Sequence, residues 1–323
     1  MIKILVYEYV TGGGLINEDL SSSLLNEAKL MTSRLYSDFE QSEHISFEFF
    51  LDERLKNYTT SHSILINKAN ANEMYNSNVL KKFDYVLPIL PETNLILYNY
   101  VKFLERENIK KLISDKQTIL SLSNKLSFYK LFANHKFNVI PTYDIKESSK
   151  INKLKNLVVK DKFGAGCSYI RIFDNPKEVD FTAYNKNYIV QPYILGEPYS
   201  ISVFFTHNDF HLLTINKQTV KKTRQKFINL KTILVNDRTV SDSKIYLLLN
   251  KIKSKLPKLY GYVGIDVIVT NEKMYIVEIN PRLTTSYIGL NKTLDISLAN
   301  LIIGQKIQKR IISGKKYFIK LNE

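Results

Sequence analysis

The chain has 323 residues, of which 44% are hydrophobic, and a formal net charge of +15. This composition excludes a disordered chain, and the length allows two or three subdomains. No apolar run reaches the roughly 18–20 residues that a membrane-spanning helix needs. The single cysteine, Cys167, excludes an internal disulfide, and residues 1–10 show no secretory signal pattern. We therefore expect a cytoplasmic protein with no membrane partner.

The excess of positive charge is the feature that first suggests nucleic-acid binding. Lysines supply nearly all of it, they are spread along the whole chain, and no run of five basic residues occurs. We therefore expect no nucleic-acid partner. Two explanations of the charge stay open: a positive field that attracts anionic substrates, and a bias in coding composition.

Strands and helices alternate over the first hundred residues and beyond. Strands are predicted at 3–10, 46–51, 63–67 and 85–90, and helices at 21–39, 95–108 and 122–134. This alternation is typical of an α/β domain with a doubly wound parallel sheet. We expect such a domain at residues 1–110.

Two features of this first domain follow predicted strands. Gly12, Gly13 and Gly14 come after the first strand, and Glu92 comes after the fourth. Open α/β sheets bind ligands beyond the carboxyl ends of their strands, so these four residues are candidate substrate contacts. A plain tight turn is the alternative for the glycines, and a helix-capping acid is the alternative for Glu92.

Phosphate-binding chemistry is predicted after residue 155. A short strand at 156–160 ends in Lys160, and Gly164 and Gly166 follow. Glycines let backbone N–H groups approach phosphate oxygens, and a lysine adds a positive charge. The segment is not a Walker A loop. If the strand ends later than expected, Lys162 would take the place of Lys160.

A second predicted strand, at 188–194, runs directly into Glu197. This stretch, with Gln191, Tyr193 and Ile194, resembles a hinge whose backbone reads the edge of an adenine. Glu197 would be the carboxylate that contacts the ribose hydroxyls.

The strongest pattern is a predicted β-hairpin near the C-terminus. If Thr270 pairs with Met274 across the polar turn, Asp266 lies directly opposite Glu278, with Cβ atoms about 4.5–5.5 Å apart. Asn280 then points to the same face, because side chains alternate along a strand. The hairpin therefore predicts two carboxylates and an amide oxygen on one face.

Two buried carboxylates this close repel each other unless a cation or a proton lies between them. Oxygen ligands suit Mg²⁺, which binds through one or two carboxylates and substrate phosphates. We expect one or two Mg²⁺ ions here, with Mn²⁺ as an alternative. A solvated acidic face is the other interpretation, but Ile268 and Ile276 are expected on the same face and disfavour it.

The densest basic stretch lies at residues 217–231. It predicts either a solvated loop or a segment that places Arg224 or Lys226 over bound phosphates.

Taken in order, these motifs resemble those of the ATP-grasp superfamily over about residues 124–286. The pieces that carry the resemblance are the lysine at 125, Lys160 with Gly164 and Gly166, the hinge at 191–194, Glu197, the set Asp266, Glu278 and Asn280, and Arg282. One departure concerns the hinge: many members have an acid and a lysine where this chain has Gln191 and Pro192, and a proline removes a backbone donor.

The resemblance implies an ATP-grasp fold at residues 111–323, with a small lid at about 126–190 and a larger antiparallel C-terminal sheet. It implies that ATP is bound through Lys125 and Lys160, with the glycine loop closing over the phosphates. Lys160 and Arg282 would be catalytic, and Arg282 would stabilise phosphoryl oxygens or a tetrahedral intermediate.

The segments at 8–15, 91–94 and 277–290 together resemble one branch of the superfamily, the tyramine–glutamate ligases of methanofuran-type cofactor biosynthesis. The branch implies ADP-forming amide synthesis between the γ-carboxylate of L-glutamate and tyramine or a similar amine, through an acyl phosphate. A homodimer is compatible with it. The alternatives are a ligase for other amino acids, a basic nucleic-acid-binding protein, and a nucleotide sensor without chemistry.

Overall fold

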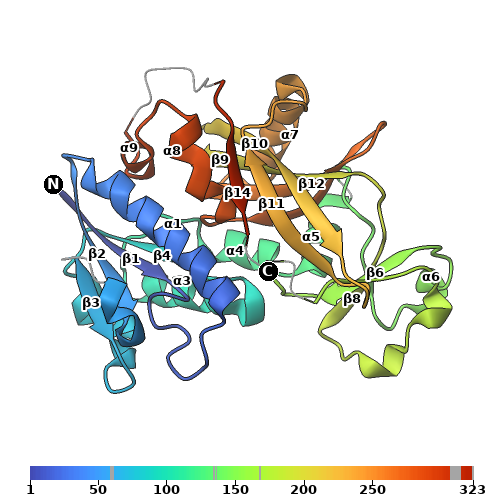
Figure 1. The fold of residues 1–323 in the computed structure, drawn as a ribbon, viewed down its shortest axis with the longest axis horizontal. Coiled ribbons are helices and arrows are strands. Elements are labelled where there is room, and N and C mark those ends of the chain that lie inside the picture. The colour runs from blue at the N-terminus through green and yellow to red at the C-terminus, as the bar shows by residue number, and fades with distance from the viewer. Residues whose placement is uncertain (59–61, 134, 136, 167–168, 306–313, 322–323) are drawn as a thin grey trace.

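The computed structural model describes the chain except residues 59–61, 134, 136, 167–168, 306–313 and 322–323. Cys167 lies outside the described residues. Figure 1 shows an N-terminal α/β layer at the left, a large twisted sheet in the middle and a small lid at the right. In the described part of the chain, no helix is long and apolar enough to cross a membrane.

The N-terminal sheet consists of four parallel strands in the order β3-β2-β1-β4. The strands are β1 (Ile2–Glu8), β2 (Ile45–Asp52), β3 (Ser63–Ile66) and β4 (Tyr85–Ile89). Helix α1 (Ser22–Glu40) covers one face and α3 (Ile96–Arg106) covers the other. The predicted doubly wound α/β domain is confirmed. Alternate residues of β1 enter the two cores, which is why this strand is apolar on both faces.

The helix predicted at 122–134 is wrong as a single element. The structure has α4 (Lys116–Ser123) and α5 (Lys125–Ala133), separated by Asn124 in an extended conformation. The Asn124 side chain accepts hydrogen bonds from the backbone N–H groups of Leu126 and Ser127, so it caps α5. The break places Lys125 at the first position of the new helix.

The large sheet has six antiparallel strands in the order β13-β12-β9-β10-β11-β14, as the predicted C-terminal sheet requires. Its strands are β9 (Glu197–Phe205), β10 (Phe210–Lys222), β11 (Ile228–Val235), β12 (Gly261–Val269), β13 (Met274–Asn280) and β14 (Tyr317–Lys320). Helices α5 and α7 (Asp242–Lys255) pack against one face of it. Part of the opposite face, including Phe204, Leu213 and Tyr262, is buried in the core that contains α8 (Leu290–Thr293) and α9 (Leu298–Ile302). The rest of that face, around Ser200 and Asp266, is open to a cavity.

The lid sheet has four antiparallel strands in the order β5-β8-β6-β7. They are β5 (Tyr143–Asp144), β6 (Leu157–Asp161), β7 (Arg171–Phe173) and β8 (Tyr188–Pro192), and they enclose a separate core. The β10–β11 turn reaches this sheet, because Ile172 N–H donates to Lys226 O at 2.9 Å and Ile228 N–H donates to Ile170 O at 3.0 Å. The remaining short helices are α2 (Ser77–Leu80) and α6 (Ser148–Ile151).

The predicted boundaries at 110 and at about 126–190 stay predictions. Two observations bear on where the chain changes from one unit to the next. The backbone of residues 110–112 still pairs with Val86 of β4. Phe128 and Phe132 of α5 pack in the core of the large sheet rather than in that of the lid.

Candidate active site

A cavity of about 510 Å³ is lined by residues of the lid, of the large sheet and of the first turns of α1. This volume is in the range of ligand-binding sites for small molecules. Most of the residues predicted for the nucleotide and the metal line it: Lys125, Lys160, Gly164, Gly166, Tyr193, Ile194, Asp266, Glu278, Asn280 and Arg282. The fold therefore brings together segments that are about 160 residues apart in the sequence.

The acidic hairpin has the predicted pair but not the predicted register. Asp266 pairs with Glu278, as expected, yet near the turn Val269, not Thr270, pairs with Met274. A register shift between Asp266 and Val267 makes up the one-residue difference. Without this β-bulge, Asp266 would lie opposite Val277, and the two carboxylates would be separated.

The bulge also corrects one prediction about the acidic face. Ile268 does line the cavity, but Ile276 is buried in the core on the opposite face of the sheet. The prediction for Ile276 is wrong because it assumed regular alternation from Ile276 to Glu278. The register shift breaks that alternation and places Val277 beside Glu278 in the cavity wall.

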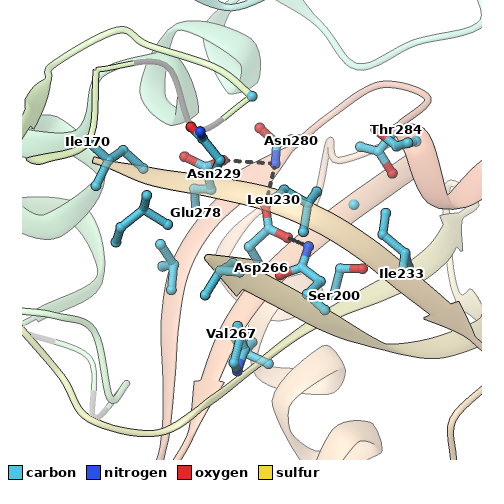
Figure 2. Close-up of a pocket in the computed structure, with 18 of the residues that line it drawn as sticks. Ile170, Ser200, Asn229, Leu230, Ile233, Asp266, Val267, Glu278, Asn280 and Thr284 are labelled. Atoms are coloured by element: carbon cyan, nitrogen blue, oxygen red, sulfur yellow. Dashed lines mark hydrogen bonds between the residues drawn. The ribbon is translucent and has the colours of Figure 1, made fainter. Parts of the chain in front are cut away.

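The polar side chains of the hairpin converge, as Figure 2 shows. The Asn280 Nδ2 group donates to Asp266 Oδ2 at 3.1 Å and to Glu278 Oε1 at 3.3 Å. From β10, Gln218 Nε2 donates to Asp266 Oδ1 at 3.1 Å. No sequence motif predicts Gln218, which stands in the basic stretch between two lysines.

The two carboxylates differ in electrostatic environment. Burial, and then the neighbouring charge of Glu278, raise the pKa of Asp266 to about 7. Burial also opposes ionisation of Glu278, but the ammonium groups of Lys125 and Lys160 outweigh it and hold the pKa of Glu278 below its usual range. The repulsion between the two carboxylates therefore mainly disfavours the ionised form of Asp266. A cation between the carboxylates would relieve this repulsion.

Two lysines connect the lid to the hairpin. Lys125 Nζ lies 3.3 Å from Glu278 Oε2 and also donates to the carbonyl of Gly164, so it ties the glycine loop to the acidic face. Lys160 lines the same cavity, and its side chain is buried. Lys162, the alternative to Lys160, does not line it, because its ammonium pairs with Asp144 at 3.3 Å and donates to Lys186 O at 2.7 Å.

The hinge residues lie in two different places. Tyr193 and Ile194 line the cavity. The Gln191 side chain is buried and donates to Thr142 Oγ1 at 2.7 Å. Glu197 is mostly exposed beyond the cavity wall, where it pairs with Lys217 at 2.6 Å. The roles predicted for these four residues in nucleotide binding stay predictions.

Two residues predicted for different roles contact each other. The Arg282 guanidinium donates to both oxygens of Glu92, with its shortest contact, from Nη2, at 2.8 Å. Burial opposes the charged guanidinium, but the Glu92 carboxylate outweighs it and raises the pKa of Arg282. Glu92 does not line the cavity, whereas Arg282 does. Glu92 therefore orients the arginine at the cavity wall.

Loss of Glu92 from its pair with Arg282 should lower the stability of the fold strongly. Only 5% of Glu92 is exposed, so Glu92→Ala leaves a buried guanidinium without its partner and should cost roughly 3–5 kcal/mol. The exposed pair of Arg106 with Glu107 offers a control: Glu107→Ala should cost less than about 1 kcal/mol. Urea unfolding of both variants measures the difference, and equal losses would show that the Glu92–Arg282 contact is not buried in solution.

The other substrate candidates lie outside the cavity lining. Residues Gly12–Gly14 form a compact turn after β1, as the alternative interpretation predicted: Gly12 N–H donates to Glu8 O at 2.8 Å, and Gly13 has a φ of 90°. Arg224 is exposed. Lys226 pairs with Asp174 at 2.9 Å and Glu178 at 2.8 Å in the lid. Their predicted substrate roles have no support from these positions.

The cavity also contains polar residues that the sequence analysis did not single out: Ser23, Glu27, Asp161, Ser200, Asn229, Lys231, Thr284, Thr285 and Ser286. No motif marks them, because they come from a helix, three strands and the segment after β13. Four carboxylates and four cationic side chains line the cavity among the described residues. The net charge of +15 is therefore not concentrated there.

The donor set fits a cation that is bound together with a nucleotide. Within the described residues, no group of three or more histidine, cysteine, aspartate or glutamate side chains could bind a metal alone. Two carboxylates with an asparagine amide are what Mg²⁺ or Mn²⁺ uses when phosphates complete its shell. The raised pKa of Asp266 is consistent with a site that is built for a cation.

Comparison with known proteins agrees with this geometry. A model of the ATP-grasp domain matches residues 122–286. Tyramine–L-glutamate ligase from Methanocaldococcus jannaschii is 29% identical over 98% of this chain and 94% of the relative. The enzyme of the same name from Methanocaldococcus fervens is 28% identical over 98% of this chain and 99% of the relative.

Solved structures show the same fold. An ATP-grasp superfamily protein from Archaeoglobus fulgidus superposes with a TM-score of 0.75 over 99% of this chain and 92% of that one, at 21% identity. At this identity the likeness concerns the fold. The family model covers just over half of the chain, and it contains all the lysine, glycine and acidic residues of the cavity that were predicted from the sequence. The chain therefore belongs to the ATP-grasp family of carboxylate–amine ligases.

Proposed function

We propose that this enzyme joins the γ-carboxylate of L-glutamate to the amine of tyramine or a close relative, forming ADP and phosphate. The observation that carries the ligase chemistry is the acidic pair Asp266 and Glu278, faced by Lys125 and Lys160 in one cavity. The choice of substrates is supported by relatives that match nearly the whole chain and are tyramine–L-glutamate ligases.

The proposed first step is phosphoryl transfer. An oxygen of the substrate carboxylate attacks the γ-phosphorus of ATP, the bond from that phosphorus to its bridging oxygen breaks, and ADP leaves. Lys125 and Lys160 neutralise phosphate charge, and the Gly164–Gly166 segment closes over the phosphates. Asp266, Glu278 and Asn280 would hold Mg²⁺ or Mn²⁺, which supplies further charge neutralisation when bound.

The proposed second step forms the amide. The amine nitrogen attacks the acyl carbon, the carbon–oxygen bond to the phosphoryl group breaks, and phosphate leaves. Arg282, which Glu92 holds at the cavity wall, would stabilise negative charge on the acyl phosphate or on the tetrahedral intermediate. The lid would protect the acyl phosphate from water.

Product analysis tests this function. Purified enzyme with ATP, Mg²⁺, L-glutamate and tyramine should give the γ-amide, ADP and phosphate in equal amounts, as mass spectrometry and nucleotide chromatography can show. AMP and pyrophosphate would contradict an acyl phosphate. A panel of other amines and amino acids would distinguish tyramine from the alternative ligase substrates, and absence of ADP formation with every pair would contradict a ligase.

The cytoplasmic location, the homodimer and the cofactor pathway stay predictions. Size-exclusion chromatography with light scattering would determine the oligomeric state.

A further inference from the structure

We infer that Glu27 is the carboxylate that binds the amine substrate and accepts its proton, an inference that rests on the proposed function. Glu27 comes from the first turns of α1, far in the sequence from the nucleotide motifs, and its side chain lines the cavity. It is the contribution of the N-terminal domain to a site otherwise made of later segments, together with Ser23 one turn before it.

The other carboxylates in the described cavity lining have different surroundings. Asp266 and Glu278 form the acidic pair of the hairpin. Asp161 lies at the end of β6 on the lid side, where its Oδ1 accepts from Phe163 N–H at 2.6 Å. Glu27 comes instead from α1, which Figure 1 shows on the side of the molecule away from the lid strands β6 and β8. Under the proposed function ADP lies against the lid lysine and the glycine loop, so an amine that enters from the α1 side meets Glu27.

The position of Glu27 is fixed by contacts with the loop that follows Arg282. The Thr285 hydroxyl donates to Glu27 Oε1. Further along the same helix, Asp38 accepts from the Tyr287 hydroxyl at 2.7 Å and from Asn291 Nδ2 at 3.1 Å. These bonds hold α1 against the segment that carries Arg282, so the carboxylate is oriented before a substrate binds.

Glu27 also lies within electrostatic range of Arg282, and its charge is one of the causes that raise the pKa of that guanidinium. The arrangement places an anion and a cation near each other in the cavity wall. The cation suits the oxygens of the acyl phosphate, and the anion suits an ammonium.

A carboxylate here has a defined chemical task. An alkylamine enters as an ammonium ion, which has no lone pair for attack. The Glu27 carboxylate pairs with it and takes one proton, the freed lone pair forms the carbon–nitrogen bond, and phosphate leaves with the electron pair of the broken carbon–oxygen bond. The second proton on nitrogen passes to the leaving phosphate. General-base groups of this kind contribute about 10²–10⁴-fold to rate.

The test separates the two half-reactions with hydroxylamine, a nucleophile that is already neutral near pH 7 and needs no carboxylate to deprotonate it. The variant Glu27→Gln should form γ-glutamyl hydroxamate from ATP, glutamate and hydroxylamine at the wild-type rate. With tyramine, its kcat/KM for the amine should fall by about a hundredfold or more. Glu27→Asp should recover part of this loss. Glu40→Gln, at the exposed end of the same helix, is the control and should behave as wild type.

Each outcome decides a separate point. Wild-type kcat/KM for tyramine in Glu27→Gln would overturn the inference. A loss of hydroxamate formation, or a raised KM for glutamate in that assay, would also overturn it, because Glu27 would then act on the first substrate or on the fold. Failure of the wild-type enzyme to form any hydroxamate from glutamate would instead contradict the proposed function.

Discussion

Replacing Lys160 by alanine should lower kcat/KM for ATP by about a hundredfold or more, with the fold intact. The side chain projects from β6 on the face opposite the lid core, into the cavity that holds the acidic hairpin. It is buried there, so its charge acts on bound phosphates with little screening by water. Steady-state kinetics with ATP as the varied substrate measures the loss.

Lys162 provides a matched control two residues further along the chain. Its ammonium is held by Asp144 and by the carbonyl of Lys186, outside the cavity. Lys162→Ala should therefore change kcat/KM by no more than about threefold, because its ammonium does not reach the cavity. A mild Lys160→Ala together with an inactive Lys162→Ala would show that the lid is arranged differently in the working enzyme.

The features that the sequence predicts best are those with short-range causes. The parallel N-terminal strands and the antiparallel hairpin follow from hydrophobic alternation and polar turns. The pairing of Asp266 with Glu278 is predictable because the two residues are only twelve apart in one hairpin. The β-bulge in this hairpin is not predictable, because the turn sequence at residues 270–273 fits more than one turn length. The prediction that Ile276 lies on the acidic face is wrong for this reason.

The features that the sequence predicts poorly depend on contacts between distant elements. Ser200 faces the cavity because side chains alternate along β9. Glu197, at the start of the same strand, points away from the cavity, and its predicted contact with the ribose stays a prediction. Glu27 and Gln218 reach the cavity through the packing of α1 and the pairing of β10. A single sequence contains no local signal for such contacts.

The break at Asn124 shows how a local signal can still be overlooked. Residues 122–134 have the apolar spacing of one helix, and Asn124 was included in it. Asparagine is also a favoured N-cap, and Lys125 is thereby placed at a helix start where it reaches both Gly164 and Glu278. The preference of Asn124 for the N-cap position therefore outweighs the apolar spacing, and the chain forms two helices.

The acidic pair predicts opposite effects of two conservative substitutions on stability and the same effect on activity. Asp266→Asn removes a carboxylate whose charge is disfavoured by burial and by Glu278. The metal-free protein should then have a higher Tm above pH about 7, where Asp266 is ionised. Glu278→Gln instead removes the partner of Lys125, so its Tm should fall. Both variants should lower kcat by about a hundredfold or more and raise the Mg²⁺ requirement.

Thermal unfolding with and without Mg²⁺ and ATP, combined with Mg²⁺ titrations of activity, measures these effects. Glu272→Gln in the exposed turn of the same hairpin is the control and should leave Tm and kcat unchanged. If the pair served only as a structural ion-pair network with Lys125, both substitutions would lower Tm and neither would alter the Mg²⁺ requirement. A higher Tm in Asp266→Asn that comes with a loss of activity would instead show that the repulsion is retained because a cation binds there during turnover.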